Sequence, residues 1–327
     1  ATPLALPRLG VVFYTSRPTQ MWYIPLPRDA QTGQLVAGTP VPLTQPGSSA
    51  MSPRFSPSGS TLVFISHAAG VESGMHAGTA ALCSLPWPQA CQGPVLPPRV
   101  VVDVVQRPSS PGAFPGLYTS QLIDEPFLGE HTLLVASQWR AHNAVLSVDL
   151  LAGTVMLLSP AGPAAAPASH ALQTVAAGRV LAVRLAPNEA TQVVVADVAA
   201  ILSAKGPVEW VPVGGTAAPL PQEVAAHLAA LEIQVTQITP RLPVADPSAQ
   251  FDSIAWLPRN RTGPLPTILV PHGGPHAALI MGWFMPYAYL TALGYAVLCP
   301  NFRGSTGYGQ AAMQSLPGHI GVHDVDD

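Results

Sequence analysis

Short apolar runs separated by Pro, Gly, Ser and Asn fill the chain from about residue 9 to residue 213. The runs are rich in β-branched and aromatic residues, and none of them has the 3.6-residue period of an amphipathic helix. We therefore expect this region to be all-β. The clearest predicted strands are residues 11–14, 21–24, 61–65, 132–135 and 144–148.

Two segments have the sequence of a β-hairpin. In residues 55–65, Pro57 presets φ for a tight turn, and Gly59 can adopt a positive φ between the two strands. Residues 144–158 repeat this pattern, with Gly153 in the turn. Such hairpins are typical of β-propeller blades, four-stranded units that recur about every 40 to 50 residues. A β-sandwich is the alternative, because the sequence has no strict period.

Residues 159–178 interrupt this pattern with a stretch rich in Pro, Gly and Ala. Clusters of these residues between periodic segments are typical of loops. We interpret the stretch as a long surface loop between strands.

The pattern changes after about residue 219. An Ala-rich segment with Glu223 near its start predicts a short helix, and residues 266–270 predict an apolar strand of the kind buried in an α/β sheet. A strand, a loop, a helix and a strand in this order begin a doubly wound α/β domain. The chain is thus predicted to divide into residues 1–220 and 221–327. The predicted elements of the second part are helix 222–231, strands 233–238, 251–257 and 266–270, helix 283–293 and strand 296–298.

Residues 277–299 contain no charged side chain, and about 20 apolar residues are enough to cross a bilayer. However, Gly282, Pro286 and Gly294 divide this run into a helix-length piece and a strand-length piece. We therefore predict a buried helix followed by a buried strand, and no membrane span.

Charge and cysteine content exclude several kinds of site. Charged residues make up only 9% of the chain and Lys205 is the sole lysine, so no phosphate-binding surface for nucleic acid is expected. Cys83, Cys91 and Cys299 are too few and too scattered for a disulfide framework or a zinc site. Reduced thiols in a cytoplasmic protein are expected, with a Cys83–Cys91 bridge as the alternative.

The strongest chemical pattern is Pro-His-Gly-Gly-Pro-His at residues 271–276, directly after the predicted strand 266–270. Consecutive glycines at the end of a strand let the backbone approach a ligand and direct N–H groups at it. Acyl-transfer enzymes need such donors for their tetrahedral oxyanion, and a related His-Gly-Gly-Gly loop supplies them in α/β hydrolases. A tight structural turn is the alternative interpretation.

A second glycine-rich segment, Asn-Phe-Arg-Gly-Ser-Thr-Gly-Tyr-Gly at residues 301–309, follows the predicted strand 296–298. Its glycines do not have the spacing of the dinucleotide fingerprint, and no lysine follows for a P-loop. Nucleotide binding is therefore not expected. His319 and His323 are four residues apart, but Pro317, Gly318 and Gly321 argue against the helix that a metal-binding pair needs, so no metal is expected.

The order of these segments resembles the prolyl oligopeptidase family of serine peptidases, and residues 315–318, Ser-Leu-Pro-Gly, followed by Gly321 and residues 324–327 resemble the acylaminoacyl peptidases in particular. The resemblance implies a partial β-propeller of several four-stranded blades, followed by the N-terminal part of an α/β-hydrolase domain. It implies a hydrolase that removes an N-acylated amino acid from the N-terminus of short peptides. It implies no cofactor and no membrane partner, and it leaves a homo-oligomer open.

The same resemblance implies which residue is the oxyanion donor. Gly274 would donate its backbone N–H to the oxyanion, with Gly273 in the same bend. His272 and Arg303 are candidate substrate-binding residues on the grounds of their position. As alternatives, His272 could hydrogen-bond within the oxyanion loop or merely pack, and Arg303 could pair with a carboxylate on a neighbouring loop.

The sequence contains no Gly-x-Ser-x-Gly, the motif that carries the nucleophile in α/β hydrolases. We therefore expect a fragment whose nucleophilic Ser, Asp and His lie beyond Asp327, and which is inactive by itself. Dipeptidyl or prolyl cleavage by a related enzyme is one alternative. A non-catalytic propeller scaffold that binds peptides is another.

Overall fold

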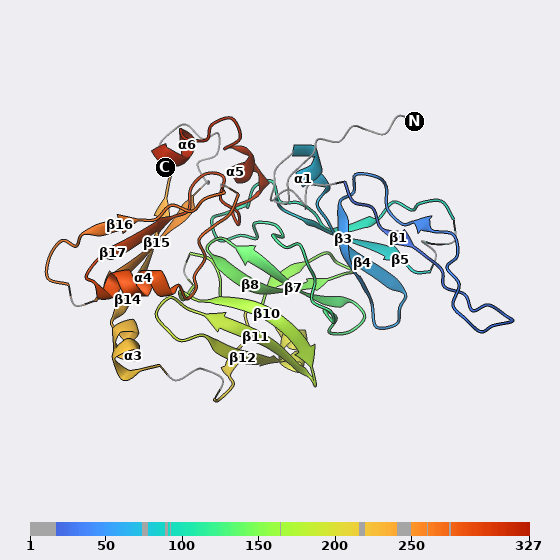
Figure 1. Cartoon of the computed structure of the whole chain (residues 1–327), viewed down its shortest axis with the longest axis horizontal. Helices are drawn as coiled ribbons and strands as arrows, with labels where there is room; N and C mark the ends of the chain where they lie inside the picture. The colour runs from blue at the N-terminus through green and yellow to red at the C-terminus, as the bar shows by residue number, and fades with distance from the viewer. Residues whose placement is uncertain are drawn as a thin grey trace.

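The computed structural model describes residues 18–73, 78–88, 91, 93–163, 165–215, 220–240, 250–259, 261–274 and 276–327. The predicted strand 11–14 lies outside these residues. Antiparallel sheets follow one another along the first two thirds of the chain, and a mixed sheet with helices lies at the other end of the molecule (Figure 1).

The first two sheets contain the predicted strands 21–24 and 61–65. In the two-stranded sheet, β1 (Trp22–Tyr23) pairs with β2 (Val41–Pro42). The second sheet has the order β3-β4-β5-β6, from β3 (Ala50–Phe55), β4 (Thr61–Ser66), β5 (Ala81–Pro86) and β6 (Arg99–Val102). The predicted turn between β3 and β4 is confirmed, with Gly59 at φ +71°.

The next sheet has the order β7-β8-β9, from β7 (Thr132–Trp139), β8 (His142–Asp149) and β9 (Val155–Leu157). It confirms the predicted strand 132–135 and the predicted hairpin 144–158, with Gly153 at φ +71° in the turn. A four-stranded sheet follows, from β10 (Ser169–Ala176), β11 (Arg179–Leu185), β12 (Gln192–Asp197) and β13 (Val211–Pro212).

Strand β10 shows that the loop interpretation of residues 159–178 was wrong for its second half. Leu172 is buried in the core, and β10 pairs along its length with β11. Ala177 and Gly178, with φ of +48° and +73°, form the tight turn between the two strands, as hairpin turns with two positive φ angles do. The strand owes its existence to this pairing and packing, which local composition does not reveal.

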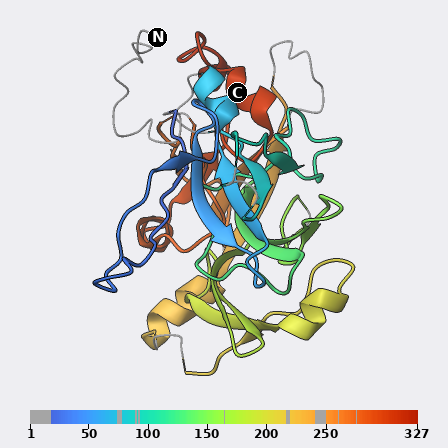
Figure 2. The same cartoon turned by 90° about the vertical axis from the view of Figure 1, so that its right-hand side faces the viewer.

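The antiparallel sheets stack face to face and share their apolar cores. In β4, Val63 and Ile65 enter one core while Leu62 and Phe64 enter another, because successive side chains in a strand point to opposite faces. Strands β7 and β8 share the first of these cores with β4 and contribute Leu134 to the core that contains β10 and β11. Each of these two sheets therefore has buried residues on both faces. Figure 2 shows the succession of the sheets, from blue through green to yellow.

Short helices accompany these sheets. They are α1 (Ala68–Ser73) and α2 (Val198–Ser203), which the all-β expectation did not include. Helix α2 begins after Asp197, whose side chain accepts a hydrogen bond from the N–H of Ala199, as an N-cap does. The main architecture of the region is nonetheless sheet, as predicted.

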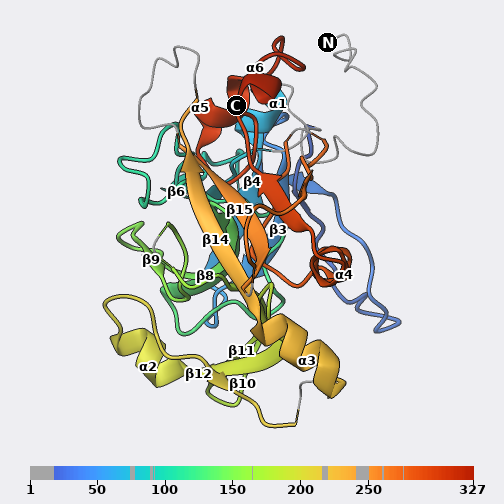
Figure 3. The ribbon, with the colours of Figure 1, turned by 90° about the vertical axis from the view of Figure 1, so that its left-hand side faces the viewer.

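The last third of the chain forms a four-stranded mixed sheet of order β14-β15-β17-β16 (Figure 3). Pairing is antiparallel between β14 and β15 and between β15 and β17, and parallel between β16 and β17. The predicted helices and strands of this part are confirmed, with shorter helices than expected. Their bounds are α3 (Gln222–Ala229), β14 (Leu231–Ile238), β15 (Phe251–Pro258), β16 (Thr267–Leu269), α4 (Met285–Ala292) and β17 (Ala296–Pro300).

Strand β16 differs from the prediction of a buried strand. It lies at the edge of the sheet, and the side chain of Leu269 is 60% exposed. Burial of a parallel strand requires neighbours on its edge and both faces, and those neighbours are not encoded in the strand itself. The core of this part lies instead between β15, β17 and α4, where Ile254, Trp256 and Val297 are buried.

Two short helices, α5 (Gln310–Gln314) and α6 (His323–Asp326), follow the mixed sheet, and α5 lies between α6 and α1 in Figure 1. No helix in the described ranges is long and apolar enough to cross a membrane. Residues 277–299 form α4 and β17, as the division of this run by Gly282, Pro286 and Gly294 predicted.

The carboxylate of Glu130, which precedes β7, accepts hydrogen bonds from the hydroxyls of Ser56, Ser58 and Ser60 in the turn between β3 and β4. The bonds from Ser56 and Ser58 lower the pKa of Glu130 from its ordinary 4.5 to about 2. Because the pKa of Glu130 is lower in the folded than in the unfolded protein, its ionised carboxylate stabilises the fold at any pH above 4.5. This stabilisation is lost as the pH falls from 4.5 through about 2.

We predict that Glu130→Gln lowers the thermal unfolding midpoint at pH 7, and that its difference from the wild type disappears towards pH 2. Glu125→Gln, at an exposed carboxylate nearby, is the control; an equal effect there would contradict the role of Glu130.

Candidate functional site

The bend of Gly273 and Gly274 follows β16, at the end of the sheet where the parallel strands β16 and β17 terminate. Gly274 has φ +98°, a conformation that side-chain-bearing residues rarely adopt. Both glycines are exposed. We call these two residues the Gly-Gly bend. The structure thus presents backbone groups of the bend to solvent, as a site for a ligand requires.

His272, immediately before the bend, is half-buried and makes three contacts. Its ring stacks on Phe302, with centroids 4.3 Å apart and planes 11° from parallel. Its Nε2 lies 2.8 Å from Oγ of Ser305, and its Nδ1 lies 3.2 Å from the carbonyl oxygen of Gly273. Burial lowers the pKa of the imidazole below its ordinary value. His272 therefore both hydrogen-bonds and packs within the loop, and substrate binding by His272 stays a prediction.

The second glycine-rich segment, residues 301–309, and the next residue, Gln310, are buried throughout. We call residues 301–310 the junction loop. Its Ser305 contacts His272, just before the Gly-Gly bend. The side chain of Asn301 accepts a hydrogen bond from the N–H of Leu279 (2.8 Å) and donates one to its carbonyl (3.0 Å). The N–H of Thr306 donates to the carbonyl of Ala277 at 2.9 Å. The junction loop therefore contacts the chain both before and after the Gly-Gly bend.

The junction loop also binds the antiparallel sheets. Thr306 donates its hydroxyl to Gln138 Oε1 (2.6 Å) and accepts from Gln138 Nε2 at its carbonyl (2.9 Å). Farther along, the N–H of Gly309 donates to the hydroxyl of Tyr118 (2.8 Å). Oε1 of Gln310 accepts from the N–H and the hydroxyl of Thr79, at 3.2 and 2.9 Å. These contacts join residues up to 231 positions apart in the sequence.

Two glycines of the junction loop permit this close approach. A Cβ on Gly307 would lie 2.7 Å from the carbonyl oxygen of Arg140, and a Cβ on Gly309 would lie 2.9 Å from that of Gln106. Both have positive φ, of +92° and +96°. The glycine spacing, which matched no phosphate-binding motif, fits contacts with the protein's own backbone. Sequence reasoning missed this role.

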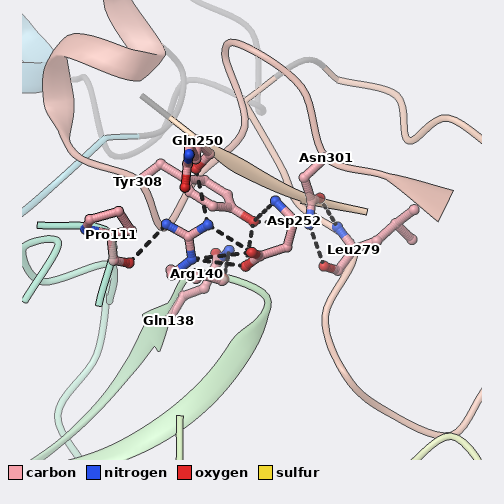
Figure 4. A network of polar contacts seen from close by, with 8 residues as sticks. All are labelled: Pro111, Gln138, Arg140, Gln250, Asp252, Leu279, Asn301 and Tyr308. Carbon is pink, nitrogen blue, oxygen red and sulfur yellow. Dashed lines mark hydrogen bonds and ion pairs between the residues drawn. The ribbon is translucent and has the colours of Figure 1, made fainter. Parts of the chain in front are cut away.

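A buried ion pair connects the two parts of the fold (Figure 4). Arg140 lies in the turn between β7 and β8, and Asp252 lies on β15. Nη2 of Arg140 is 2.7 Å from Oδ1 of Asp252, and Nε is 3.0 Å from Oδ2. The side chains are only 5% and 1% exposed. This two-point geometry is the strong form of an Arg–carboxylate pair.

Neighbouring groups complete the hydrogen bonding of the pair, as Figure 4 shows. Arg140 donates to the carbonyls of Pro111 (2.9 Å) and Gln250 (3.0 Å). The hydroxyl of Tyr308, from the junction loop, donates to Oδ2 of Asp252 at 3.2 Å, and the Tyr308 ring lies under the guanidinium at 4.9 Å. Burial, and then the negative charge of Asp252, raise the pKa of Tyr308 well above its ordinary value. The hydroxyl therefore stays protonated and can donate.

Arg303 forms a second buried ion pair. Its Nη2 is 2.7 Å from Oδ1 of Asp327, its Nε is 2.8 Å from Oδ2, and its side chain is 3% exposed. It also donates to the carbonyl of His323 at 3.1 Å. Of the two roles considered for Arg303, pairing with a carboxylate is the one present here, and substrate binding stays a prediction.

The cysteines and the pair His319 and His323 form neither a disulfide nor a metal site among the described residues. Cys83, Cys91 and Cys299 are free thiols, so the alternative of a Cys83–Cys91 bridge was wrong. Burial raises the pKa of Cys83 to about 11 and that of Cys299 to about 12, which makes both poor nucleophiles. The rings of His319 and His323 stack at 4.2 Å, and the described residues contain no group of three or more His, Cys, Asp or Glu that could bind a metal.

Comparison with known proteins gives one family. Residues 3–224 match the family model described as the N-terminal domain of acylamino-acid-releasing enzyme. The chain is 31% identical to the acylamino-acid-releasing enzyme of Arabidopsis thaliana, over 98% of this chain and 42% of the relative. It is 29% identical to that of Homo sapiens, over 98% of this chain and 40% of the relative. The chain spans about two fifths of the length of these curated relatives.

Solved structures show a similar fold. Pyrococcus horikoshii acylaminoacyl peptidase aligns with a TM-score of 0.61 and 12% identity, over 95% of this chain and 40% of that protein. A puromycin hydrolase aligns with a TM-score of 0.55 and 20% identity, over 88% of this chain and 47% of that protein. At these identities the similarity is one of fold alone.

The buried ion pair leads to a stability prediction. Arg140→Met or Asp252→Asn should each lower the free energy of unfolding by about 3–5 kcal/mol, because each leaves one charged group buried without its partner. The double variant Arg140→Met/Asp252→Leu should lose less than either single variant. Urea unfolding followed by tryptophan fluorescence measures these changes. The control is Asp124→Asn, which breaks an ion pair whose carboxylate is fully exposed and should change stability by less than about 1 kcal/mol. Single variants no worse than this control would contradict the prediction.

The close approach of the junction loop to the backbone of Arg140 leads to a second stability prediction. Gly307→Ala and Gly321→Ala both place Ala at a positive φ, +92° and +82°, which by itself costs about 1–2 kcal/mol. Only at Gly307 would the new Cβ also meet backbone, whereas Gly321 has open space around it. We predict a clearly larger fall in unfolding midpoint for Gly307→Ala, measured by differential scanning calorimetry. Equal falls would mean that the contact between Gly307 and Arg140 does not constrain the fold.

Proposed function

The chain belongs to the family of acylamino-acid-releasing enzymes, and we propose that it provides the substrate-screening and oxyanion-binding parts of a serine peptidase. This peptidase releases an N-acylated amino acid from the N-terminus of short peptides. The observation that carries the proposal is the Gly-Gly bend, exposed at the end of the parallel strands β16 and β17, with Gly274 at φ +98°.

The proposed architecture is a partial β-propeller over residues 1–220 and the N-terminal part of an α/β-hydrolase domain over residues 221–327. Face-to-face sheets that share their cores support the first assignment, since consecutive propeller blades pack in this way. The start of α3 at Gln222 and the parallel pair β16–β17 support the second. The exposed edge of β16, with Leu269 in water, favours continuation of the sheet by further strands.

The proposed chemistry assigns the backbone N–H of Gly274 to the oxyanion that forms when a nucleophile attacks a peptide carbonyl. Such a donor lowers the barrier because its dipole is already oriented when the charge develops. The nucleophile and its partners are proposed to come from the region that follows these residues in the longer relatives. His272 and Arg303 both bind other residues of the protein. We propose that they orient the Gly-Gly bend and the junction loop around the substrate.

N-acylated short peptides are the proposed substrates, and the cytoplasm is the proposed location. The three free thiols, two of them buried, support a reducing compartment. The oligomeric state stays a prediction.

We predict that the complete protein, in which this chain is joined to the region that follows it in the relatives, hydrolyses acetyl-alanyl peptides in preference to unblocked X-Pro peptides. It should also react with a fluorophosphonate probe. Gly274→Ala should lower kcat by on the order of 10²-fold, because displacing one oxyanion donor has an effect of this size. Gly294→Ala is the matched control, since Gly294 has a similar φ of +92° and open surroundings.

Preference for X-Pro substrates would favour the dipeptidyl or prolyl alternative, and absence of both labelling and hydrolysis would favour the peptide-binding scaffold. Equal effects of the two glycine variants would contradict the role of Gly274.

A further inference from the structure

The hydrogen bonds around His272 determine its tautomer. Oγ of Ser305 accepts the N–H of Phe302 at 2.9 Å, so the hydroxyl proton of Ser305 is available to Nε2 of His272, 2.8 Å away. The opposite nitrogen, Nδ1, faces the carbonyl oxygen of Gly273 at 3.2 Å, and only an N–H can bind there. Of the two neutral tautomers, only the one with its proton on Nδ1 satisfies both contacts, because it donates to the carbonyl of Gly273 and accepts from the hydroxyl of Ser305.

Neutral imidazole is also the form that the surroundings favour. Ser305 is fully buried and Phe302 stacks on the ring, so a charged imidazolium would lose hydration on this side. The lowered pKa of His272 has the same cause. No carboxylate is in hydrogen-bonding contact with His272 among the described residues.

The carbonyl of Gly273 belongs to the same peptide unit as the N–H of Gly274. A trans peptide is planar, and its C=O and N–H point in opposite directions. A hydrogen bond from His272 to this carbonyl therefore fixes the direction of the Gly274 N–H, away from the imidazole. Glycine on both sides of the unit would otherwise allow the plane to rotate with little steric resistance.

We infer that Ser305 is a positioning residue, which sets the tautomer of His272 and through it the orientation of the Gly273–Gly274 peptide. This inference rests on the proposed function, because it assigns to that peptide the oxyanion donor. Ser305 is well placed for this task, since the next residue, Thr306, is bound to Gln138 of the antiparallel sheets. The orientation of the donor is thereby coupled to the contact between the two parts of the fold.

The first test needs no substrate. It measures the tautomer of His272 and the orientation of the Gly274 N–H by NMR of the protein labelled with ¹⁵N in histidine and glycine. In the wild type, the imidazole nitrogens of His272 should show the Nδ1–H tautomer. In Ser305→Ala, we expect the Nε2–H tautomer that free imidazole side chains prefer, together with a changed residual dipolar coupling of the Gly274 N–H. An unchanged tautomer or an unchanged coupling would overturn the inference.

The second test is kinetic and uses the complete protein with an acetyl-alanyl substrate. Ser305→Ala should lower kcat by about tenfold or more while KM stays within about twofold, because a misdirected donor affects the transition state more than substrate binding. Ser305→Thr, which keeps the hydroxyl, should restore part of the loss. Ser315→Ala is the control, since the hydroxyl of Ser315 donates within its own turn, to the carbonyl of Ala312 at 2.7 Å.

The two tests separate the possible failures. A wild-type protein that hydrolyses no N-acylated peptide would refute the proposed function, while the NMR comparison would still decide whether Ser305 orients the peptide. A Ser305→Ala variant with altered tautomer and full kcat would show that this orientation has no catalytic role. A loss of kcat equal to that in Ser315→Ala would reduce Ser305 to a structural residue.

Discussion

The buried ion pair between Arg140 and Asp252 is the interaction on which the rest of this structure depends. Two charged groups removed from water cost several kcal/mol each, and this cost is offset only when both meet with good geometry and complete hydrogen bonding. The Arg140–Asp252 pair meets these requirements, and it joins the turn between β7 and β8 to β15, 112 residues later in the chain. The relative placement of the antiparallel sheets and the mixed sheet is therefore constrained: a shift of either part would leave a charge buried without its partner.

The junction loop extends this constraint to the candidate site. Tyr308 completes the hydrogen bonds of Asp252, Thr306 binds Gln138, and Ser305 binds His272 next to the Gly-Gly bend. One short segment thus contacts the ion pair, the antiparallel sheets and His272, which precedes the proposed oxyanion donor. In the peptidase proposed above, such a segment would let the antiparallel sheets determine how the proposed oxyanion donor is held. The glycines of the segment serve this packing, since side chains at Gly307 or Gly309 would overlap with the backbone of Arg140, in the turn between β7 and β8, or of Gln106, in the loop after β6.

Local patterns were sufficient for much of the fold. Pro57, Gly59 and Gly153 identified two hairpins correctly, because turn geometry depends on the residues of the turn itself. Local patterns do not reveal burial or pairing that comes from distant segments. The composition of β10 predicts a loop, because its pairing with β11 and its packing are tertiary, and the apolar run of β16 predicts burial although the strand lies at an edge. The same limit applied to the site. The Gly-Gly bend was visible in the sequence, but its partner Ser305 is 33 residues away, and nothing near Arg140 indicates Asp252.

Because the same buried contacts hold the junction loop and the two parts of the fold together, the three should open as one cooperative unit. Native-state hydrogen exchange of the backbone amides measures this directly, since amides that open together show the same free energy of exchange. The amides of Thr306, Gly309 and Gln310, which are bonded to Ala277, Tyr118 and Val105, should exchange with the same free energy as the amides of β8 and β15. Exchange of these three amides at much lower free energy, while β8 and β15 remain protected, would contradict the account.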